Sequence, residues 1–168
     1  MHLQNYNFKK LFIILFTLLL LFFPFINYSF ANEDVQISAP SVILMDYASG
    51  KILYEKNANQ RMYPASTTKL MTAILTLENC ELSDIATVSY NAIMTVPSGY
   101  TNANLHVDEE LTIEQLLHIL LIPSANDAAN VLAEHIAGSV ESFSTMMNTK
   151  ALELGCKDTH FVNPSGIH

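Results

Sequence analysis

Residues 63–73 of the chain are Tyr63-Pro64-Ala65-Ser66-Thr67-Thr68-Lys69-Leu70-Met71-Thr72-Ala73. The proline suits the first turn of a helix, because its preset φ and missing N–H cost nothing there. Ser66 would lie in that turn, where free N–H groups favour negative charge, with Lys69 three residues later on the same face. A hydroxyl beside an amine at such a place can act as an activated nucleophile. The helix that follows is expected to be buried on most sides by Leu70, Met71, Ile74, Leu75 and Leu77.

Ser-x-x-Lys is a common pattern on its own. At ordinary residue frequencies a chain of this length contains it about once by chance, and this chain contains it once. The simplest alternative is that Ser66 caps the helix and that Lys69 is a solvated lysine. The rest of the chain has to decide between these interpretations.

Residues 1–31 have the organisation of a signal peptide. Lys9 and Lys10 form a short basic region before an unbroken apolar run at residues 11–23, which is short for a membrane span. Small residues at Ser29 and Ala31 fit a signal-peptidase site, so we expect cleavage after Ala31. The alternative is an uncleaved N-terminal anchor. Both interpretations place the remainder outside the cytoplasm.

The remainder, residues 32–168, is strongly acidic. It keeps all 16 Asp and Glu residues but six of the eight Lys and Arg residues, which gives a formal charge of −10. This balance disfavours nucleic acid and anionic lipid as partners. The length suits one modest domain.

Few residues are of the types that form disulfides or bind metals. The two cysteines, Cys80 and Cys156, leave a disulfide open, but we favour two unpaired thiols. The histidines lack metal-ligand spacing, so we expect no metal.

Residues 41–57 predict an antiparallel hairpin. Apolar and β-branched runs at residues 41–45 and 52–55 flank a turn that contains Gly50. Residues 83–104 have weak periodicity, and we expect an irregular, partly helical excursion there.

Three amphipathic helices are predicted after this excursion. The first starts at the capping-box pair Thr112 and Gln115 and is ended by Pro123. The second covers residues 126–138 and closes at a glycine, and the third covers residues 140–154. Their inward side chains are expected to be Ile113, Leu116, Leu117, Leu120 and Leu121, then Ala129, Leu132, Ala133 and Ile136, then Phe143, Met146, Met147, Ala151 and Leu154. One hairpin followed by helices indicates an α+β fold with an incomplete sheet.

Ser124 and Asn126 lie at the corner between the first two of these helices. A hydroxyl and a carboxamide at this spacing can both point into one cleft. The alternative is that one of them caps the following helix. Ser89 and Asn91 have the same spacing, so the pattern alone does not establish a site.

Taken together, these stretches resemble a known family. Residues 64–73 resemble the nucleophile motif of serine-type D-alanyl-D-alanine carboxypeptidases, the low-molecular-mass penicillin-binding proteins, and residues 42–57 resemble their opening strands. Residues 120–129 resemble the second motif, which excludes the pattern at Ser89. Similar stretches recur between residues 147 and 166, so the resemblance covers nearly all of the chain after the leader.

The resemblance implies an α+β fold of the β-lactamase and DD-peptidase type, and a hydrolase that removes the terminal D-Ala of peptidoglycan stem peptides. Ser66 would form the acyl-enzyme, with Lys69 as general base. Ser124 would relay the proton, and Asn126 would hold the substrate amide. β-Lactams would acylate Ser66 as substrate mimics, and no cofactor is implied.

One motif of the wider superfamily is missing. Its signature combines Ser-x-x-Lys, Ser-Asp-Asn and Lys-Thr-Gly, and the chain contains no Lys-Thr-Gly. The resemblance places that motif, further strands and a membrane-associating part beyond His168. We therefore expect residues 32–168 to be the N-terminal part of a catalytic domain, with only the first hairpin of its sheet, and to be inactive alone.

Two alternatives remain open. A class A β-lactamase shares Ser-x-x-Lys but needs a deacylating Glu some way after the second motif, and no Glu follows Glu153 in this chain. The other alternative is a non-catalytic protein of the cell envelope that keeps the fold.

Overall fold

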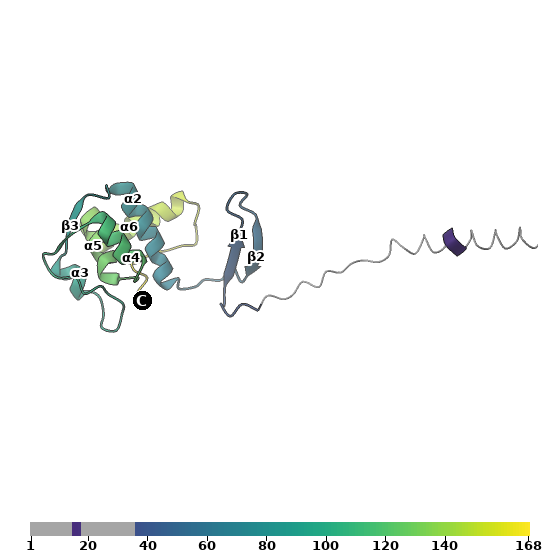
Figure 1. The fold of residues 1–168 in the computed structure, drawn as a ribbon, viewed down its shortest axis with the longest axis horizontal. Helices are drawn as coiled ribbons and strands as arrows, with labels where there is room; N and C mark the ends of the chain where they lie inside the picture. Colours follow the sequence, from purple (N-terminus) through teal and green to yellow (C-terminus); the bar gives the residue numbers. More distant parts are fainter. Residues whose placement is uncertain (1–14, 18–35) are drawn as a thin grey trace, which may run out of the picture. The chain divides into compact units, whose positions relative to one another are not determined.

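The computed structural model describes residues 15–17 and 36–168. The predicted signal peptide, residues 1–31, therefore lies almost wholly outside the described residues. The chain divides into two compact units after Ala58, and Figure 1 labels their elements. Among the described residues, no helix has both the length and the apolar character needed to cross a membrane.

The first unit contains the predicted hairpin. Strand β1 (Val42–Met45) pairs antiparallel with β2 (Ile52–Lys56), with an irregular register between Leu44 and Met45. The turn closes by a 2.9 Å hydrogen bond from Gly50 N–H to the Asp46 carbonyl. Gly50 has φ +69°, which glycine adopts without steric cost.

The second unit is a helical cluster with one small sheet. Its elements are the 3₁₀ turn η2 (Ala65–Thr68), α2 (Lys69–Asn79), β3 (Ile85–Thr87), α3 (Tyr90–Met94), β4 (Glu110–Thr112), α4 (Ile113–Leu121), α5 (Asn126–Ala137) and α6 (Val140–Glu153). Helices and small antiparallel sheets together confirm the predicted α+β class.

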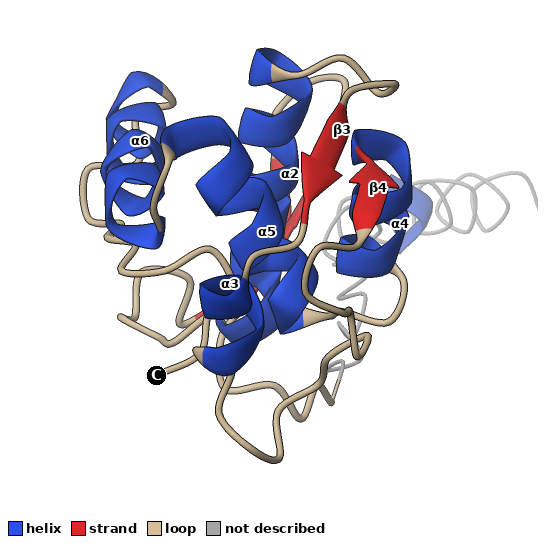
Figure 2. Cartoon of the chain, turned by 90° about the vertical axis from the view of Figure 1, so that its left-hand side faces the viewer, coloured by secondary structure: helices blue, strands red, loops and turns tan. Residues whose placement is uncertain are grey.

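Helix α5 is the centre of this unit. It packs against α2, α3, α4, α6 and β3, and Figure 2 shows it between α6 on one side and the two strands on the other. Every residue from 126 to 133 is buried, which is more than the one stripe that we predicted. Small side chains at Ala128, Ala129 and Ala133 are fully buried, so neighbouring elements can approach α5 from several sides.

The burial predicted for α2 is wrong on one side. Met71 and Leu75 are buried, but Leu70, Ile74 and Leu77 are 60%, 40% and 59% exposed. The buried part of the helix also carries polar residues, namely Lys69, Thr72 and Thr76. Burial is predicted from the apolar stripe of a helix. This prediction fails where a helix buries polar side chains that form a site.

Three further expectations need correction. Leu154 and Leu121 are exposed, because Leu154 lies after the last turn of α6 and Leu121 ends α4.

The excursion at residues 83–104 contains the short helix α3, as expected, but also strand β3. This strand pairs with β4 in a second two-stranded sheet, with Ile85 opposite Thr112, so the hairpin at residues 41–57 is not the whole of the sheet structure.

The start of α4 is confirmed in detail. The Thr112 hydroxyl accepts from Gln115 N–H at 3.1 Å, and the Gln115 side chain accepts from Thr112 N–H at 2.9 Å. This capping box satisfies two N–H groups that would otherwise lack partners.

We expect Thr112→Ala to lower the free energy of unfolding by about 1 kcal/mol, because the cap is lost. Urea unfolding measures this difference. Thr145→Ala is the control, since Thr145 is exposed and its hydroxyl bonds only to the Glu141 carbonyl of its own helix; it should change stability by less than about 0.5 kcal/mol. Equal effects of the two substitutions would contradict a special role of the cap.

Candidate active site

The turn η2 brings Ser66 and Lys69 together. Pro64 precedes it, and the Pro64 carbonyl accepts from both the N–H and the hydroxyl of Thr67. Ser66 is exposed, whereas Lys69, the first residue of α2, is only 2% exposed. Lys69 Nζ lies 3.3 Å from Ser66 Oγ. Neither η2 nor α2 has a side-chain cap, so the structure does not support the alternative of a capping serine and a solvated lysine.

Three neutral oxygens surround the Lys69 amine. Besides Ser66 Oγ, Nζ is within 2.7 Å of Asn126 Oδ1 and 3.1 Å of the Ser165 carbonyl. None of the ion pairs found among the described residues includes Lys69. Burial lowers the pKa of the Lys69 amine below its ordinary value of 10.5, since it penalises the charged form.

The three oxygens around Nζ match the three N–H groups of an ammonium, and the same arrangement also accommodates a neutral amine whose lone pair faces Ser66. A backbone carbonyl such as that of Ser165 can only accept. Asn126 Oδ1 must also accept, because its Nδ2 donates to the Thr101 carbonyl at 2.7 Å. These two acceptors use the two N–H groups of a neutral amine. In the neutral form the lone pair would be left for the Ser66 hydroxyl proton.

Ser124 lies in the tight corner between α4 and α5. Its φ is +63°, a conformation that non-glycine residues rarely adopt and that often marks functional sites. Its Oγ is buried and has no hydrogen-bond partner among the described residues, which is uncommon for a buried hydroxyl. Residue 125 occupies the N-cap of α5 without a side-chain bond, so neither Ser124 nor Asn126 caps this helix.

The structure therefore joins three of the four predicted site residues by hydrogen bonds. Ser66, Lys69 and Asn126 form one connected group, and Ser124 Oγ is not bonded to it. The competing pattern at Ser89 has a structural role, since Ser89 Oγ caps α3 by accepting from Ala92 N–H at 2.9 Å.

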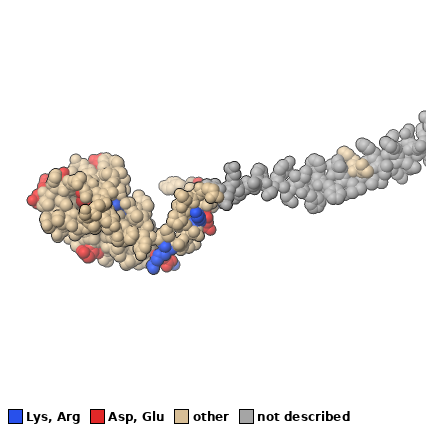
Figure 3. Space-filling view, turned by 90° about the horizontal axis from the view of Figure 1, so that it is seen from below, with Lys and Arg blue, Asp and Glu red and all other residues tan. Residues whose placement is uncertain are grey.

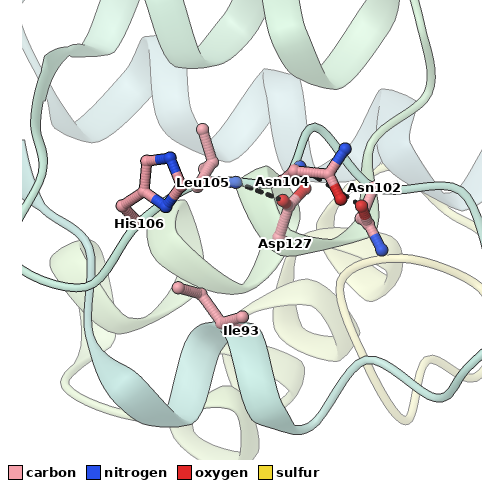
Figure 4. Close-up of a pocket in the computed structure, with 6 residues that line it drawn as sticks. All are labelled: Ile93, Asn102, Asn104, Leu105, His106 and Asp127. Atoms are coloured by element: carbon pink, nitrogen blue, oxygen red, sulfur yellow. Dashed lines mark hydrogen bonds between the residues drawn. The ribbon is translucent and has the colours of Figure 1, made fainter.

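Asp127 is a buried residue of this region that the sequence analysis did not single out. It is 1% exposed, and its carboxylate accepts from the N–H groups of Ala103 at 3.0 Å and Leu105 at 3.2 Å. Figure 4 shows the carboxylate facing this loop at the edge of a small pocket. An acidic residue in the first turn of a helix directly after Ser-x-Asn was the available signal.

Asn126 and Asp127 hold the same loop from two sides. The Thr101 carbonyl accepts from Asn126 N–H at 3.0 Å as well as from its side chain. The orientation of the Asn126 amide thus depends on the position of residues 101–105, which Asp127 fixes.

The described residues contain no group of three or more His, Cys, Asp or Glu side chains arranged to hold a metal ion. Cys80 and Cys156 are free thiols. Acidic side chains are spread over the face of the helical unit seen in Figure 3.

Comparison with known proteins identifies the family. The family model of the D-alanyl-D-alanine carboxypeptidases matches residues 28–168. The chain belongs to this family. It is 39% identical to the D-alanyl-D-alanine carboxypeptidase DacF of Bacillus subtilis over 141 residues, which is 81% of the chain and 36% of that protein. It is 37% identical to DacC of Escherichia coli, over 86% of the chain and 39% of that protein.

Solved structures of the family have the same fold. Penicillin-binding protein 6B from Escherichia coli matches with a TM-score of 0.74 and 36% identity, over 83% of this chain and 47% of that one. DacD from Francisella tularensis matches with a TM-score of 0.74 and 34% identity, over 80% of this chain and 33% of that one. The chain therefore spans between about a third and a half of these four proteins.

We expect Asp127→Asn to release residues 101–105, because an amide places an N–H₂ group against backbone donors that the carboxylate now satisfies. The free energy of unfolding should fall by about 2 kcal/mol, and amide hydrogen exchange at Ala103 and Leu105 should accelerate. Asn130→Ser is the control, since Asn130 lies on the same helix, is 8% exposed and bonds to the Ala92 carbonyl instead. Unchanged exchange at the two amides in Asp127→Asn would contradict this role.

Proposed function

We propose that this chain carries the nucleophile and the base of a serine-type D-alanyl-D-alanine carboxypeptidase. Its substrate is a peptidoglycan stem peptide that ends in D-Ala-D-Ala. The observation that carries the proposal is the buried Lys69 amine, held between Ser66 and two oxygens that can only accept. The family membership of the chain supports the same reaction.

In this reaction the Ser66 hydroxyl attacks the carbonyl carbon of the penultimate D-Ala, and its proton passes to the Lys69 lone pair. The C–N bond then breaks, and the leaving amine of the terminal D-Ala takes a proton. The unbonded hydroxyl of Ser124 relays that proton. Water hydrolyses the resulting ester and restores Ser66. A β-lactam ring opens on Ser66 by the same attack.

Asn126 is proposed to hold the substrate. Its Oδ1 is occupied by Lys69, and one proton of Nδ2 by the Thr101 carbonyl. An amide nitrogen has two protons, so the second is free to donate to a carbonyl of the stem peptide. Asn126 would then fix the base and the substrate with a single side chain.

The proposal extends to the organisation of the chain and to the place where it acts. Residues 1–31 are proposed as a signal peptide and residues 32–168 as the N-terminal part of the catalytic domain, acting at the extracytoplasmic face of a bacterial envelope. The Ser66 N–H would supply part of the oxyanion hole. The resemblance assigns the rest to a Lys-Thr-Gly strand, which residues 1–168 do not contain. Membrane association is expected only through the C-terminal part that the resemblance implies after that strand.

The carboxypeptidase is favoured over the class A β-lactamase because the family found is that of the carboxypeptidases. The absence of a Glu after residue 153 agrees with this choice. The remaining alternative is a non-catalytic envelope protein. Covalent labelling by a penicillin distinguishes it from the carboxypeptidase.

We expect a fluorescent penicillin to label the full-length protein covalently, and Ser66→Ala to abolish the labelling. Gel fluorescence after denaturation measures the bound label. Ser89→Ala is the matched control, because Ser89 also precedes a helix, but its hydroxyl caps that helix and donates to the Glu134 carboxylate; its labelling should persist. Labelling that survives in Ser66→Ala would move the acyl site elsewhere, and no labelling of the unmodified protein would favour the non-catalytic alternative.

A further inference from the structure

The turn at residues 163–166 lies directly against the turn that carries Ser66. A Cβ atom placed on Gly166 would lie 2.0 Å from the Ala65 carbonyl oxygen and 2.8 Å from Thr68 Oγ1. Only glycine therefore fits at this position, and its φ of +83° also favours glycine. The two turns approach as closely as their backbones allow.

The same turn bonds to α2 through two successive carbonyl groups. The Pro164 carbonyl accepts from the Thr72 hydroxyl at 2.7 Å, and the Ser165 carbonyl accepts from Lys69 Nζ at 3.1 Å. Asn163 Oδ1 braces the turn from within by accepting from the N–H of Gly166 at 2.7 Å. Lys69 and Thr72 lie three residues apart and share a face of α2. The position of one carbonyl therefore fixes that of the other.

We propose that Thr72 is a positioning residue for Lys69: its hydroxyl holds the Pro164 carbonyl so that the next carbonyl, of Ser165, stays aimed at the Lys69 amine. This inference rests on the proposed function, since it concerns how the base is oriented. Among the described residues, the Thr72 hydroxyl is bonded to the Pro164 carbonyl and not to Ser66. Its effect passes through the Ser165 carbonyl.

Thr76 shows what a purely structural threonine does in the same helix. It is also 0% exposed, but its hydroxyl donates to the Thr72 carbonyl of its own helix at 2.8 Å. This bond to the carbonyl four residues earlier is the usual solution for a buried threonine within a helix. Thr72 instead donates to a carbonyl 92 residues further along the chain.

Replacement of Thr72 by valine keeps the shape of the side chain but removes the donor. The Pro164 carbonyl then loses its partner, and the turn shifts away from α2 to find another. The Ser165 carbonyl moves with it, so the Lys69 amine turns and its lone pair no longer points at Ser66. Misplacement of a reacting group by about 1 Å costs roughly 100-fold in rate.

The test measures the rate of penicillin acylation of the full-length protein at several penicillin concentrations. This dependence gives two separate quantities: the acylation rate at saturation and the affinity of the noncovalent penicillin complex that forms before the reaction. Thr72→Val should lower the saturating rate about 10- to 100-fold and leave that affinity within about 3-fold. Thr72→Ser, which restores the donor, should recover most of the lost rate. Thr76→Val should acylate at a rate close to that of the unmodified protein.

A saturating rate in Thr72→Val equal to that in Thr76→Val would overturn the inference, and so would a loss confined to affinity. Should Thr72→Val not fold, the comparison of Thr72→Ala with Thr72→Ser replaces it, since both lack the methyl group and differ in the hydroxyl. Equal rates in that pair would also overturn the inference. Failure of the proposed function itself is distinct, because the unmodified protein would then not be acylated at Ser66.

Discussion

The burial of the Lys69 amine is the constraint on which the rest of the site depends. A charged ammonium group removed from water without an anionic partner is expensive, so burial favours the neutral form. The oxygens that contact Nζ belong to Ser66, Asn126 and the Ser165 carbonyl, which are all uncharged. They can bind a neutral amine and fix its direction without restoring the charge. A carboxylate in the same place would hold the proton on the lysine.

Three separate parts of the helical unit must meet for this to happen. The turn η2 and the start of α2 bring Ser66 and Lys69, the start of α5 brings Asn126, and the turn at residues 163–166 brings the last carbonyl. The central place of α5 explains how they are held, because this helix packs against α2, α3, α4, α6 and β3, and residues 126–133 at its start are all buried. Asp127 adds a second support by holding the loop whose Thr101 carbonyl orients Asn126.

Local features of this arrangement could be predicted from the sequence. The capping box at Thr112, the glycine that ends α5 and the spacing of Ser66 and Lys69 all depend on neighbours within a few residues. The resemblance to the family identified which of the two Ser-x-Asn patterns belongs to the site. The roles given to Ser66, Lys69, Ser124 and Asn126 stay predictions.

Contacts between distant residues could not be predicted in the same way. The Ser165 carbonyl, the Thr72 hydroxyl and the Thr101 carbonyl are groups that nearly every protein contains, and only the fold makes them neighbours of the site. The exposed side of α2 was misjudged for a related reason. Leu70, Ile74 and Leu77 indicate a buried face, but the buried part of the helix includes Lys69, Thr72 and Thr76. Apolar periodicity assumes that burial and polarity exclude each other, and a site built in a helix breaks that assumption.

The protonation of Lys69 tests this account most directly. NMR of the Nζ and Cε nuclei of selectively labelled lysine, recorded across the alkaline range in the full-length protein, follows each amine, and Lys69→Arg identifies the signal of Lys69. The account predicts that this amine loses its proton with a pKa below the ordinary 10.5 of lysine. A pKa at or above 10.5 would contradict it, because burial would then not be favouring the neutral form of the amine.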